Sequence, residues 1–563
     1  MKLGDGSRGM LPERWLERWQ WLEMGREGED GEVRFARHQA WLIDALLDAQ
    51  GRVDTDVEYR RFVDGLAKFE RIEAVDPPST FRGELRGYQR EGLGWFAHLE
   101  RLGIGGCLAD DMGLGKTVQV LAWLESRRTR RAKKGEERRP SLVVVPRSLL
   151  FNWKDEAARF TPRMRVALHH GTGRGKLVDE TFAADLVLTT YGTLRRDAAL
   201  FDDQPFDVVV LDEAQAIKNE GSQASKAVRL LEARQRVALS GTPVENHIDE
   251  LWALFEFLNP GMLGSVPAFR RLLAGKALGA SAGDDPEEAA ERRNAAIRAV
   301  GRAIRPFFLR RTKDAVLTDL PEKTEQIVHV ELPARQRKAY DAAADYYRAR
   351  FLGADVVDEG NGESFDTMIA LTAILRLRQL ACHQGLVDAE RAKDPSGKLD
   401  ELVPMLAELV GEGHKAVVFS QFTTFLDLVA DRLENEGLAF TTLTGATRDR
   451  KKPVELFQND PSTPILLVSL KAGGTGLNLT AADYVFLLDP WWNPAVEAQA
   501  VDRAHRIGRT RPVHAYRLVA RDTIESRVLE LQASKRLLAA TLMDGAAASA
   551  GEITREDLRA LLG

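Results

Sequence analysis

Residues 105–121, GGCLADDMGLGKTVQVL, join a short apolar stretch through a glycine-rich turn to a helical pattern. The turn matches the end of the phosphate-binding pattern GxxxxGKT at Gly113, Gly115, Lys116 and Thr117. Backbone N–H groups at the start of the helix can hold phosphates, Lys116 can reach the β- and γ-phosphates, and Thr117 can bind Mg²⁺. Because Asp110 replaces the first glycine of the pattern, this segment alone does not establish a nucleotide site.

Residues 206–219, FDVVVLDEAQAIKN, supply a matching half, a hydrophobic strand that ends in two acids. This order is typical of a Walker B element. Asp212 would hold Mg²⁺, directly or through water, and Glu213 would orient and deprotonate the attacking water. A bound cation also stabilises two neighbouring carboxylates, which would otherwise need a costly pKa shift. The two segments together predict a site for ATP and Mg²⁺.

Short apolar, β-branched runs recur along the chain and alternate with helical patterns. Such runs indicate parallel sheets that are covered by helices on both faces. They form two groups separated by a mostly helical stretch, so we predict an α/β fold with two tandem parallel-sheet lobes. The first group lies at 142–146, 185–190, 207–214 and 236–243, and the second at 415–422, 439–445, 465–470, 484–490 and 513–520.

The composition favours a folded protein of more than one domain. The chain has 563 residues, of which 44% are hydrophobic and 29% charged. Its net charge of −5 argues against binding nucleic acid through global charge. A DNA groove needs only a local basic lining, and basic runs occur at 127–134, 305–313 and 502–511. We expect the first to be a solvated surface loop, whereas the other two lie beside motifs. Cys107 and Cys382 are too few to build a disulfide framework or a structural zinc site.

The N-terminal residues and the apolar runs give an expectation for localisation. No apolar run approaches the roughly 20 residues that span a bilayer, and MKLGDGSRGM lacks the apolar stretch of a secretory signal. We therefore expect a cytoplasmic protein with no membrane partner. Three tryptophans at helical spacing within residues 11–22 predict a small packing region. Because KLGDGSRGMLP resembles a strand cut midway, we also expect a larger N-terminal region in relatives or in the native gene.

A basic segment in the second half, QAVDRAHRIGRT (499–510), places Arg503 and Arg506 three residues apart. On a helix the two side chains share one face. If that face points at a cleft, both can act as arginine fingers on the γ-phosphate, typically worth ~10³–10⁵ in rate. Hydrolysis would then require the lobes to close, which converts ATP binding into domain motion. For this stretch taken alone, a solvated basic helix is the alternative.

In their order from about residue 81 to 545, these motifs resemble those of the SWI/SNF-like ATPases of helicase superfamily two. DDMGLGKT and LDEAQ are similar to motifs I and II. Residues 239–261 resemble motif III and its extension, and motifs IV, V and VI are matched by 417–422, 469–494 and 499–510. Motif II ends in Gln215 where His is commoner, and motif VI has Arg509 where the family often has Gln. Neither difference removes a catalytic group.

The resemblance implies ATP and Mg²⁺ as cofactors and assigns further site residues. Gln89, within FRGELRGYQREGLGW (81–95), would read adenine. Coupling of the γ-phosphate to motif III would run through Gln215, Ser240 and Thr242. Nucleotide contacts would come from Asp110, Asp111, Met112, Gly113, Leu114, Gly115, Lys116, Thr117 and, in motif V, Gly476.

The resemblance also implies that the two tandem parallel-sheet lobes are RecA-like, and it implies a domain order. We expect an N-terminal helical remnant (1–80), lobe 1 (81–305), an inter-lobe linker (306–325), lobe 2 (326–545) and a tail (546–563). Helical insertions, the protrusions of the family, would lie within 250–305 and 334–400. A C-terminal brace would lie at 523–535.

Double-stranded DNA is the partner that the resemblance implies, held in a groove across both lobes. Side-chain donors and exposed N–H groups at strand ends can hold phosphates without reading sequence. For each such residue, a turn or cap is an equal alternative. The candidates are Arg147, Gly171, Thr190, Gln421, Arg448, Lys471 and Trp491.

Three functions follow from this pattern. The leading prediction is a DNA-dependent ATPase that translocates on duplex DNA without separating the strands. A motor acting on a DNA-bound protein, such as stalled RNA polymerase, is the first alternative, because no reader domain is recognisable. A non-translocating DNA-binding scaffold is the second, and the intact catalytic positions argue against it.

Overall fold

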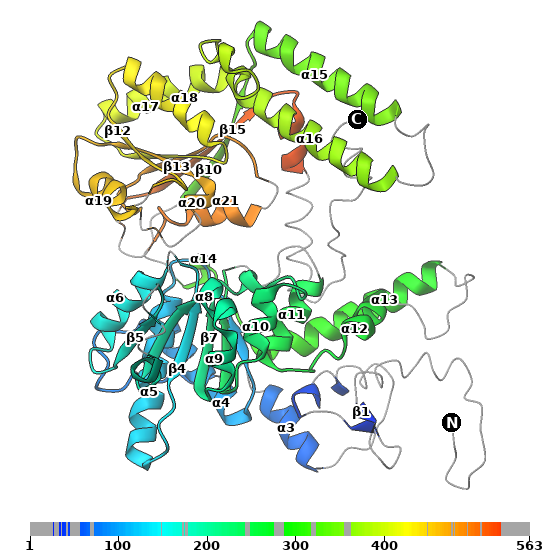
Figure 1. Ribbon diagram of the computed structural model, residues 1–563, viewed down its shortest axis with the longest axis vertical. Helices are drawn as coiled ribbons and strands as arrows, with labels where there is room; N and C mark the ends of the chain where they lie inside the picture. Colours follow the sequence, from blue (N-terminus) through cyan, green and yellow to red (C-terminus); the bar gives the residue numbers. More distant parts are fainter. Residues whose placement is uncertain are drawn as a thin grey trace. The chain divides into compact units, whose positions relative to one another are not determined.

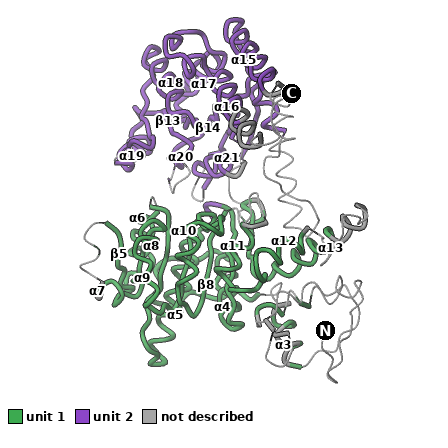
Figure 2. The backbone as a smooth tube through the Cα atoms, turned by 45° about the vertical axis from the view of Figure 1, so that its right-hand side comes forward, with its two compact units in different colours: residues 1–111, 115–316, 537–550 green, residues 112–114, 317–536, 551–563 purple. Residues whose placement is uncertain are grey.

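The computed structural model describes residues 26–27, 33–34, 37–40, 43–44, 57–67, 72–147, 149–171, 174, 178–241, 248–274, 286–316, 323–353, 362–447, 449–473, 477, 479–491, 494–506, 509 and 511–530. The chain forms two compact units (Figure 2). Unit 1 comprises residues 1–111, 115–316 and 537–550, and unit 2 comprises 112–114, 317–536 and 551–563.

Unit 1 contains a seven-stranded, fully parallel sheet in the order β5-β6-β4-β7-β8-β3-β9 (Figure 1). Its strands are β3 (Gly106–Leu108), β4 (Ser141–Val145), β5 (Val166–His169), β6 (Leu186–Thr190), β7 (Phe206–Asp212), β8 (Ala233–Leu239) and β9 (Phe308–Leu309). The connecting helices are α4 (Gly87–Leu102), α5 (Lys116–Lys134), α6 (Leu150–Phe160), α7 (Val178–Phe182), α8 (Tyr191–Arg196), α9 (Ala198–Asp202) and α10 (Gln223–Arg229). They are followed by α11 (Ile248–Leu258), α12 (Val266–Ala274), α13 (Pro286–Ile304) and α14 (Lys313–Val316).

Both faces of this sheet are covered, as β4 illustrates. All five of its residues are buried. Val143 belongs to a core with Trp95 of α4. Val144, which points to the opposite face, belongs to a second core with Phe201 of α9. This double burial explains why the central strands are continuously apolar.

Unit 2 contains a six-stranded, fully parallel sheet in the order β10-β15-β14-β11-β13-β12. Its strands are β10 (Lys323–Val330), β11 (Ala416–Ser420), β12 (Phe440–Leu443), β13 (Ile465–Ser469), β14 (Tyr484–Leu487) and β15 (Val513–Ala520). Its helices are α15 (Ala334–Gly353), α16 (Gly362–Cys382), α17 (Gly397–Gly411), α18 (Thr423–Asn435), α19 (Lys451–Asn459), α20 (Leu470–Gly473) and α21 (Pro494–Val501). Helices α15 and α16 lie side by side (Figure 1).

The predicted two parallel-sheet α/β lobes are confirmed. Helices α11 to α13, and helices α15 and α16, lie largely within the spans predicted for the two insertions, whereas α17 extends beyond residue 400 to Gly411. Of the predicted brace, residues 524–530 are helical and 531–535 lie outside the described residues, as does the 546–563 tail.

The predicted linker at 306–325 has different bounds in the structure. Phe307 is fully buried, and β9 pairs with β3, so the first sheet extends beyond residue 305. Strand β10 joins the second sheet from Lys323 onward. Residues 317–322 between these elements lie outside the described residues.

The N-terminal region is described only in part. It holds a two-stranded antiparallel ladder, β1 (Arg26–Glu27) with β2 (Val33–Arg34), and helix α3 (Val57–Ala67). The tryptophan-rich segment predicted as a helix at 11–22 lies outside the described residues. None of the helices described here is both long and apolar enough to cross a bilayer.

Candidate active site

The glycine-rich turn leads from β3 directly into α5. Gly113 and Gly115 have φ values of 88° and 77°, in the left-handed region that favours glycine. A Cβ on Gly115 would lie 2.6 Å from Nε2 of Gln89. The loop and the predicted adenine-reading residue are therefore packed together, and Gly115 allows their close approach.

Lys116 and Gln89 are both held by local contacts. The Lys116 ammonium donates to the carbonyl of Asp110 at 2.5 Å and lies 3.4 Å from the carbonyl of Asp111. Gln89 is buried at the third position of α4, where its Oε1 accepts from the Arg86 N–H at 2.9 Å. Both side chains are thus positioned at the loop, and the ammonium can exchange carbonyl partners for phosphate oxygens.

The Asp110 carboxylate forms an ion pair with Arg311. Arg311 donates through Nε to Oδ1 at 2.9 Å and through Nη2 to Oδ2 at 2.6 Å, a bidentate pair. Gln119 also donates to Oδ2, at 3.2 Å, and accepts from Arg311 at 2.9 Å. Asp110 is completely buried. Its side chain therefore supports the loop, while its carbonyl accepts from Lys116.

Two further contacts fasten the segment after β9 to the loop. The Lys313 N–H donates to Oδ2 of Asp111 at 3.0 Å, and the Asp111 N–H donates to the Arg311 carbonyl at 3.0 Å. Arg311 also donates to the carbonyl of Tyr88 and stacks on its ring. The sequence indicated a basic run at 305–313 and an inter-lobe linker at 306–325, so Arg311 was not predicted as part of this site.

Asp212 lies at the carboxyl end of β7 and is 8% exposed. Its Oδ2 accepts from Trp153 Nε1 at 2.8 Å, and its Oδ1 accepts from the Glu213 N–H at 2.9 Å. Burial, and next the adjacent Glu213 charge, raise the pKa of Asp212 to about 7. A divalent cation would offset both effects, so the carboxylate fits the predicted Mg²⁺ ligand.

A hydrogen-bonded chain joins Glu213 to the end of β8. Gln215 Nε2 donates to Oε2 of Glu213 at 2.8 Å, and Ser240 Oγ donates to Oε1 of Gln215 at 3.2 Å. Glu213 has a φ of 51°, a left-handed conformation that is uncommon for a non-glycine residue. The structure thus brings together two of the three predicted coupling residues, and Thr242 lies outside the described residues.

In unit 2, the two predicted arginine fingers differ in exposure. Arg503 is 3% exposed and its carbonyl accepts from the Leu479 N–H at 3.0 Å, whereas Arg506 is half-buried. Arg509 has a structural role instead. It donates to Asp483 at 2.9 Å and to the carbonyls of Thr480 at 2.9 Å and Pro512 at 3.1 Å.

Comparison with protein families identifies the chain. Residues 88–386 match the SNF2-related domain, and residues 397–508 match the helicase conserved C-terminal domain. The chain belongs to the SNF2 family. This confirms the resemblance to SWI/SNF-like ATPases that the motifs indicated.

Several relatives of this SNF2 chain are known. YwqA of Bacillus subtilis, named for an ATP-dependent helicase/translocase, is 35% identical over 88% of this chain and 53% of its own length. The TATA-binding protein-associated factor MOT1 of Saccharomyces cerevisiae is 32% identical over 86% of this chain and 29% of its own. The human SWI/SNF-related regulator of chromatin subfamily A member 1 is 35% identical over 81% and 43%. The SNF2 chain thus spans about half, or less, of these relatives.

Among solved structures, the SNF2 chain is similar to the SWI2/SNF2 ATPase core of Sulfolobus solfataricus in complex with dsDNA. The two are 34% identical, and the match covers 84% of this chain and 96% of that one with a TM-score of 0.40.

Three predicted DNA contacts of the SNF2 chain follow neighbouring strands of the first sheet. Arg147 follows β4, Gly171 follows β5, and Thr190 ends β6, so all three lie at the carboxyl edge. Arg147 and Gly171 are exposed, and Gly171 has a φ of 89° with open space around it. Thr190 is buried and caps α8 by accepting from the Thr193 N–H at 3.2 Å.

The remaining predicted contacts of the SNF2 chain lie in unit 2. The Gln421 N–H donates to Asp489 at 3.2 Å. The Trp491 N–H donates to Glu497 at 2.6 Å, and Arg378 stacks over the Trp491 ring at 5.5 Å, so this tryptophan packs within its lobe. Lys471 lies in α20, and Arg448 lies outside the described residues, as does Gly476, which was predicted to contact the nucleotide.

Proposed function

We propose that this chain is a DNA-dependent ATPase that couples ATP hydrolysis to translocation along double-stranded DNA without strand separation. The observation that carries the proposal is the hydrogen-bonded chain from Glu213 through Gln215 to Ser240, next to the metal-ligand candidate Asp212. A catalytic carboxylate linked by hydrogen bonds to a neighbouring strand end is suited to transmit the state of the nucleotide.

Each proposed group has one task in hydrolysis. Gln89 and the loop from Asp110 to Thr117 bind ATP, with Lys116 on the β- and γ-phosphates. Thr117 and Asp212 hold Mg²⁺, which neutralises charge on the phosphate oxygens when bound. Glu213 takes a proton from the attacking water, the new bond forms at the γ-phosphorus, and the bond to the β–γ bridging oxygen breaks to leave ADP.

The second lobe supplies the remaining positive charge in this proposal. Arg503 and Arg506 act on the γ-phosphate when the lobes close, with Gly476 of motif V at the nucleotide. Gln215 relays the presence of the γ-phosphate from Glu213 to Ser240 and on to Thr242. ATP binding and hydrolysis then drive closing and opening of the lobes.

Duplex DNA is the proposed track. The exposed Arg147 and the open backbone at Gly171 lie at the same edge of the sheet as Asp212, where sequence-independent phosphate contacts are suitable. Arg448, Lys471 and Gln421 are the corresponding proposed contacts in unit 2. The names of three relatives, a helicase/translocase, a TATA-binding protein-associated factor and a regulator of chromatin, support DNA as the partner.

A side-by-side turnover assay tests the proposal. ATP hydrolysis is measured with duplex DNA, single-stranded DNA and RNA, and we expect stimulation to be strongest with the duplex. Glu213→Gln should lower turnover by at least about 10², the usual contribution of a general base, and leave duplex affinity unchanged. Displacement of a third strand without unwinding of the duplex would demonstrate translocation. Turnover that is indifferent to duplex DNA would contradict the coupling.

A motor directed at a DNA-bound protein is the second candidate, favoured by the match to MOT1, which is named for association with the TATA-binding protein. RNA polymerase stalled on DNA is the target that we would test first. Release of purified stalled polymerase that requires ATP and Glu213 would support this candidate. Release of an unrelated DNA-bound protein at the same rate would favour general translocation instead.

A further inference from the structure

A cavity of about 530 Å³ lies in unit 1 away from the strand ends that carry the catalytic groups. Its wall includes the C-terminal half of α5, the turn before β5, and Ser141, Asp185 and Asp207 at the amino ends of β4, β6 and β7. In a parallel sheet the amino and carboxyl ends of the strands lie at opposite edges. The cavity is therefore distinct from the ATP site.

Arginine dominates the lining of this cavity. Six arginines and three carboxylates are among the thirteen lining residues. The arginines are Arg128, Arg131, Arg138, Arg139, Arg163 and Arg165, and the carboxylates are Glu136, Asp185 and Asp207. The lining thus carries an excess of positive charge.

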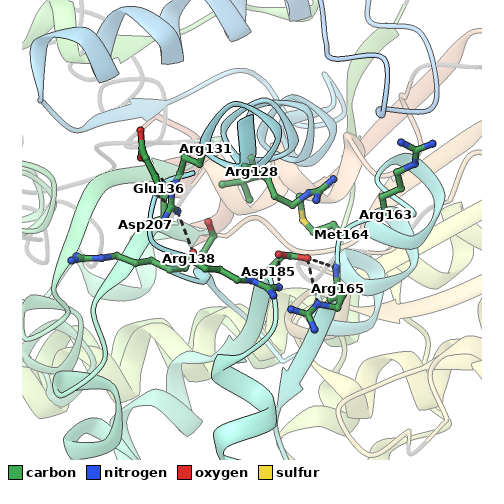
Figure 3. Close-up of a pocket in the computed structure, with 13 residues that line it drawn as sticks. Arg128, Arg131, Glu136, Arg138, Arg163, Met164, Arg165, Asp185 and Asp207 are labelled. Atoms are coloured by element: carbon green, nitrogen blue, oxygen red, sulfur yellow. Dashed lines mark hydrogen bonds and ion pairs between the residues drawn. The ribbon is translucent and has the colours of Figure 1, made fainter. Parts of the chain in front are cut away.

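The three lining carboxylates offset this charge only in part, because Asp185 and Asp207 each serve two arginines. Arg128 is paired with Glu125, which lies outside the lining, at 2.8 Å. Asp185 accepts from Arg138 at 2.6 Å and lies 3.9 Å from Arg165, and Figure 3 shows it between these two side chains. Asp207 is shared between Arg127 at 2.8 Å and Arg131 at 3.2 Å.

Some guanidinium N–H groups in the lining of this cavity are not hydrogen-bonded to the described residues. Within the part of the chain that the structure describes, Arg163 forms no ion pair, and it is exposed on the turn before β5. The Nε atoms of Arg131 and Arg139 are buried and form no hydrogen bond among the described residues; each faces a carboxylate at longer range, Glu136 at 3.7 Å from Arg131 and Glu137 at 3.5 Å from Arg139. Buried donors without acceptors are unfavourable, and an anion would satisfy them.

We propose that this cavity binds a small molecule that bears phosphate groups. Planar guanidinium groups match phosphate oxygens with paired donors, and several converge here on one hollow. The volume lies within the roughly 300–1,000 Å³ of small-molecule sites. Leu124, Met164 and Ala132 supply an apolar wall for the rest of such a ligand.

Nucleic-acid backbone is the other source of phosphate, and the geometry favours a small ligand. Proteins bind duplex DNA through lysine and arginine side chains that are spread along its phosphate backbone. The arginines of this cavity instead surround a single concave space. The proposed DNA contacts, Arg147 and Gly171, lie at the opposite edge of the sheet. This inference stands apart from the proposed function, and its test measures binding and not ATP hydrolysis.

The test uses the full chain carrying Lys116→Ala, which weakens the loop site, and titrates it with tripolyphosphate by calorimetry. We expect one class of site, whose affinity falls by about tenfold or more when Arg163→Ala and Arg165→Ala are added, because charge-assisted bonds are lost. Ala132→Glu should have the same effect, since it adds a carboxylate and removes no contact of the fold. Arg270→Ala with Arg271→Ala, on the exposed face of α12, is the matched control and should leave the affinity unchanged.

Two outcomes would overturn the proposal. The first is an absence of tripolyphosphate binding in the Lys116→Ala chain, or binding that both cavity variants leave intact. The second comes from an arm in which a DNA duplex replaces tripolyphosphate. We expect duplex affinity to be unaffected by the cavity variants, and a loss of duplex binding as large as that of tripolyphosphate would assign the cavity to nucleic-acid backbone.

Discussion

Single residues in the ATP-site candidate are constrained by close contacts and by charge. Gly115 combines a left-handed backbone with tight packing, since a methyl group added to it would lie 2.6 Å from the Gln89 amide nitrogen. Asp212 combines near-complete burial with a neighbouring carboxylate, and its pKa is raised as a result. Each constraint makes a separate prediction.

Gly115→Ala should impair ATP binding. The new methyl group forces Gln89 away and strains a residue with φ of 77°, at a cost of about 1–2 kcal/mol for the backbone alone. We expect the KM for ATP to rise by about tenfold or more. Gly135→Ala is the control, because Gly135 has φ of 65° but open space around it. Gly135→Ala should lower the melting temperature and leave the KM for ATP unchanged. Equal KM values for the two variants would show that the contact between residue 115 and Gln89 does not matter for ATP binding.

Asp212 should make stability and Mg²⁺ binding depend on pH. Its pKa is raised from 3.8 to about 7 in the folded chain, so the folded state holds a proton that the unfolded state has lost between these values. Without Mg²⁺, this group therefore lowers the free energy of unfolding as pH rises from about 4 to about 7. Mg²⁺ favours the ionised form, so it should raise the melting temperature more at pH 8 than at pH 6.

Thermal unfolding with and without Mg²⁺ at the two pH values checks this prediction. In Asp212→Asn the Mg²⁺ effect should be small and independent of pH, because no proton is displaced. A Mg²⁺ effect in the unsubstituted chain that is equal at both pH values would mean that Asp212 is already ionised in the metal-free fold.

At the scale of elements, long buried strands were predictable, whereas of the four edge strands in the two parallel sheets only β12 was. Strands such as β4 and β11 are buried on both faces, so their sequences are continuously apolar. The missed strand β10, KTEQIVHV, is an edge strand with mostly exposed residues, and its first four residues are polar, so it contains no apolar run of the kind that identified the central strands. Strands β5 and β9 are also at edges, and β3 is short and merges with the glycine-rich turn.

The residues of the candidate site likewise fall into those that the sequence predicts and those that it does not. Lys116, Asp212 and Glu213 were predictable because each lies within a few residues of the pattern that identifies it. Arg311 was not, since its partner Asp110 is 201 residues away and only folding brings the two together. Strand β9 carries this arginine to the loop by pairing with β3.

Arg311→Lys should therefore weaken both the fold and ATP binding. Lysine cannot donate two parallel hydrogen bonds to Asp110, and a buried carboxylate that loses its pair costs about 3–5 kcal/mol at most. We expect a lower melting temperature and a raised KM for ATP. The adjacent Arg310→Lys is the matched control, because Arg310 is exposed, and it should change neither. Indistinguishable behaviour of the two variants would show that the pair with Asp110 does not support the loop.

At the scale of the whole molecule, the two lobes were predictable from the grouping of apolar runs, whereas their boundary was not. Strand β9 follows a long helical insertion yet belongs to the first sheet, because Phe307 and its neighbours pack against that core. Each unit has its own parallel sheet and its own core clusters. The proposed chemistry, by contrast, draws residues from both units.

Substitutions in motif VI can separate this shared chemistry from the stability of unit 2. Arg506→Ala should lower kcat by about 10³ or more, as loss of an arginine finger does, with little change in the melting temperature or in ATP binding. Arg509→Gln should lower the melting temperature and leave kcat largely unchanged. Arg509 is buried and bonded to Asp483 and to several carbonyls, so its loss destabilises unit 2 while kcat, measured well below the melting temperature, is retained. Turnover, nucleotide binding and thermal unfolding of both variants provide the comparison, and a kcat loss in Arg509→Gln as deep as that in Arg506→Ala would place Arg509 in the chemistry.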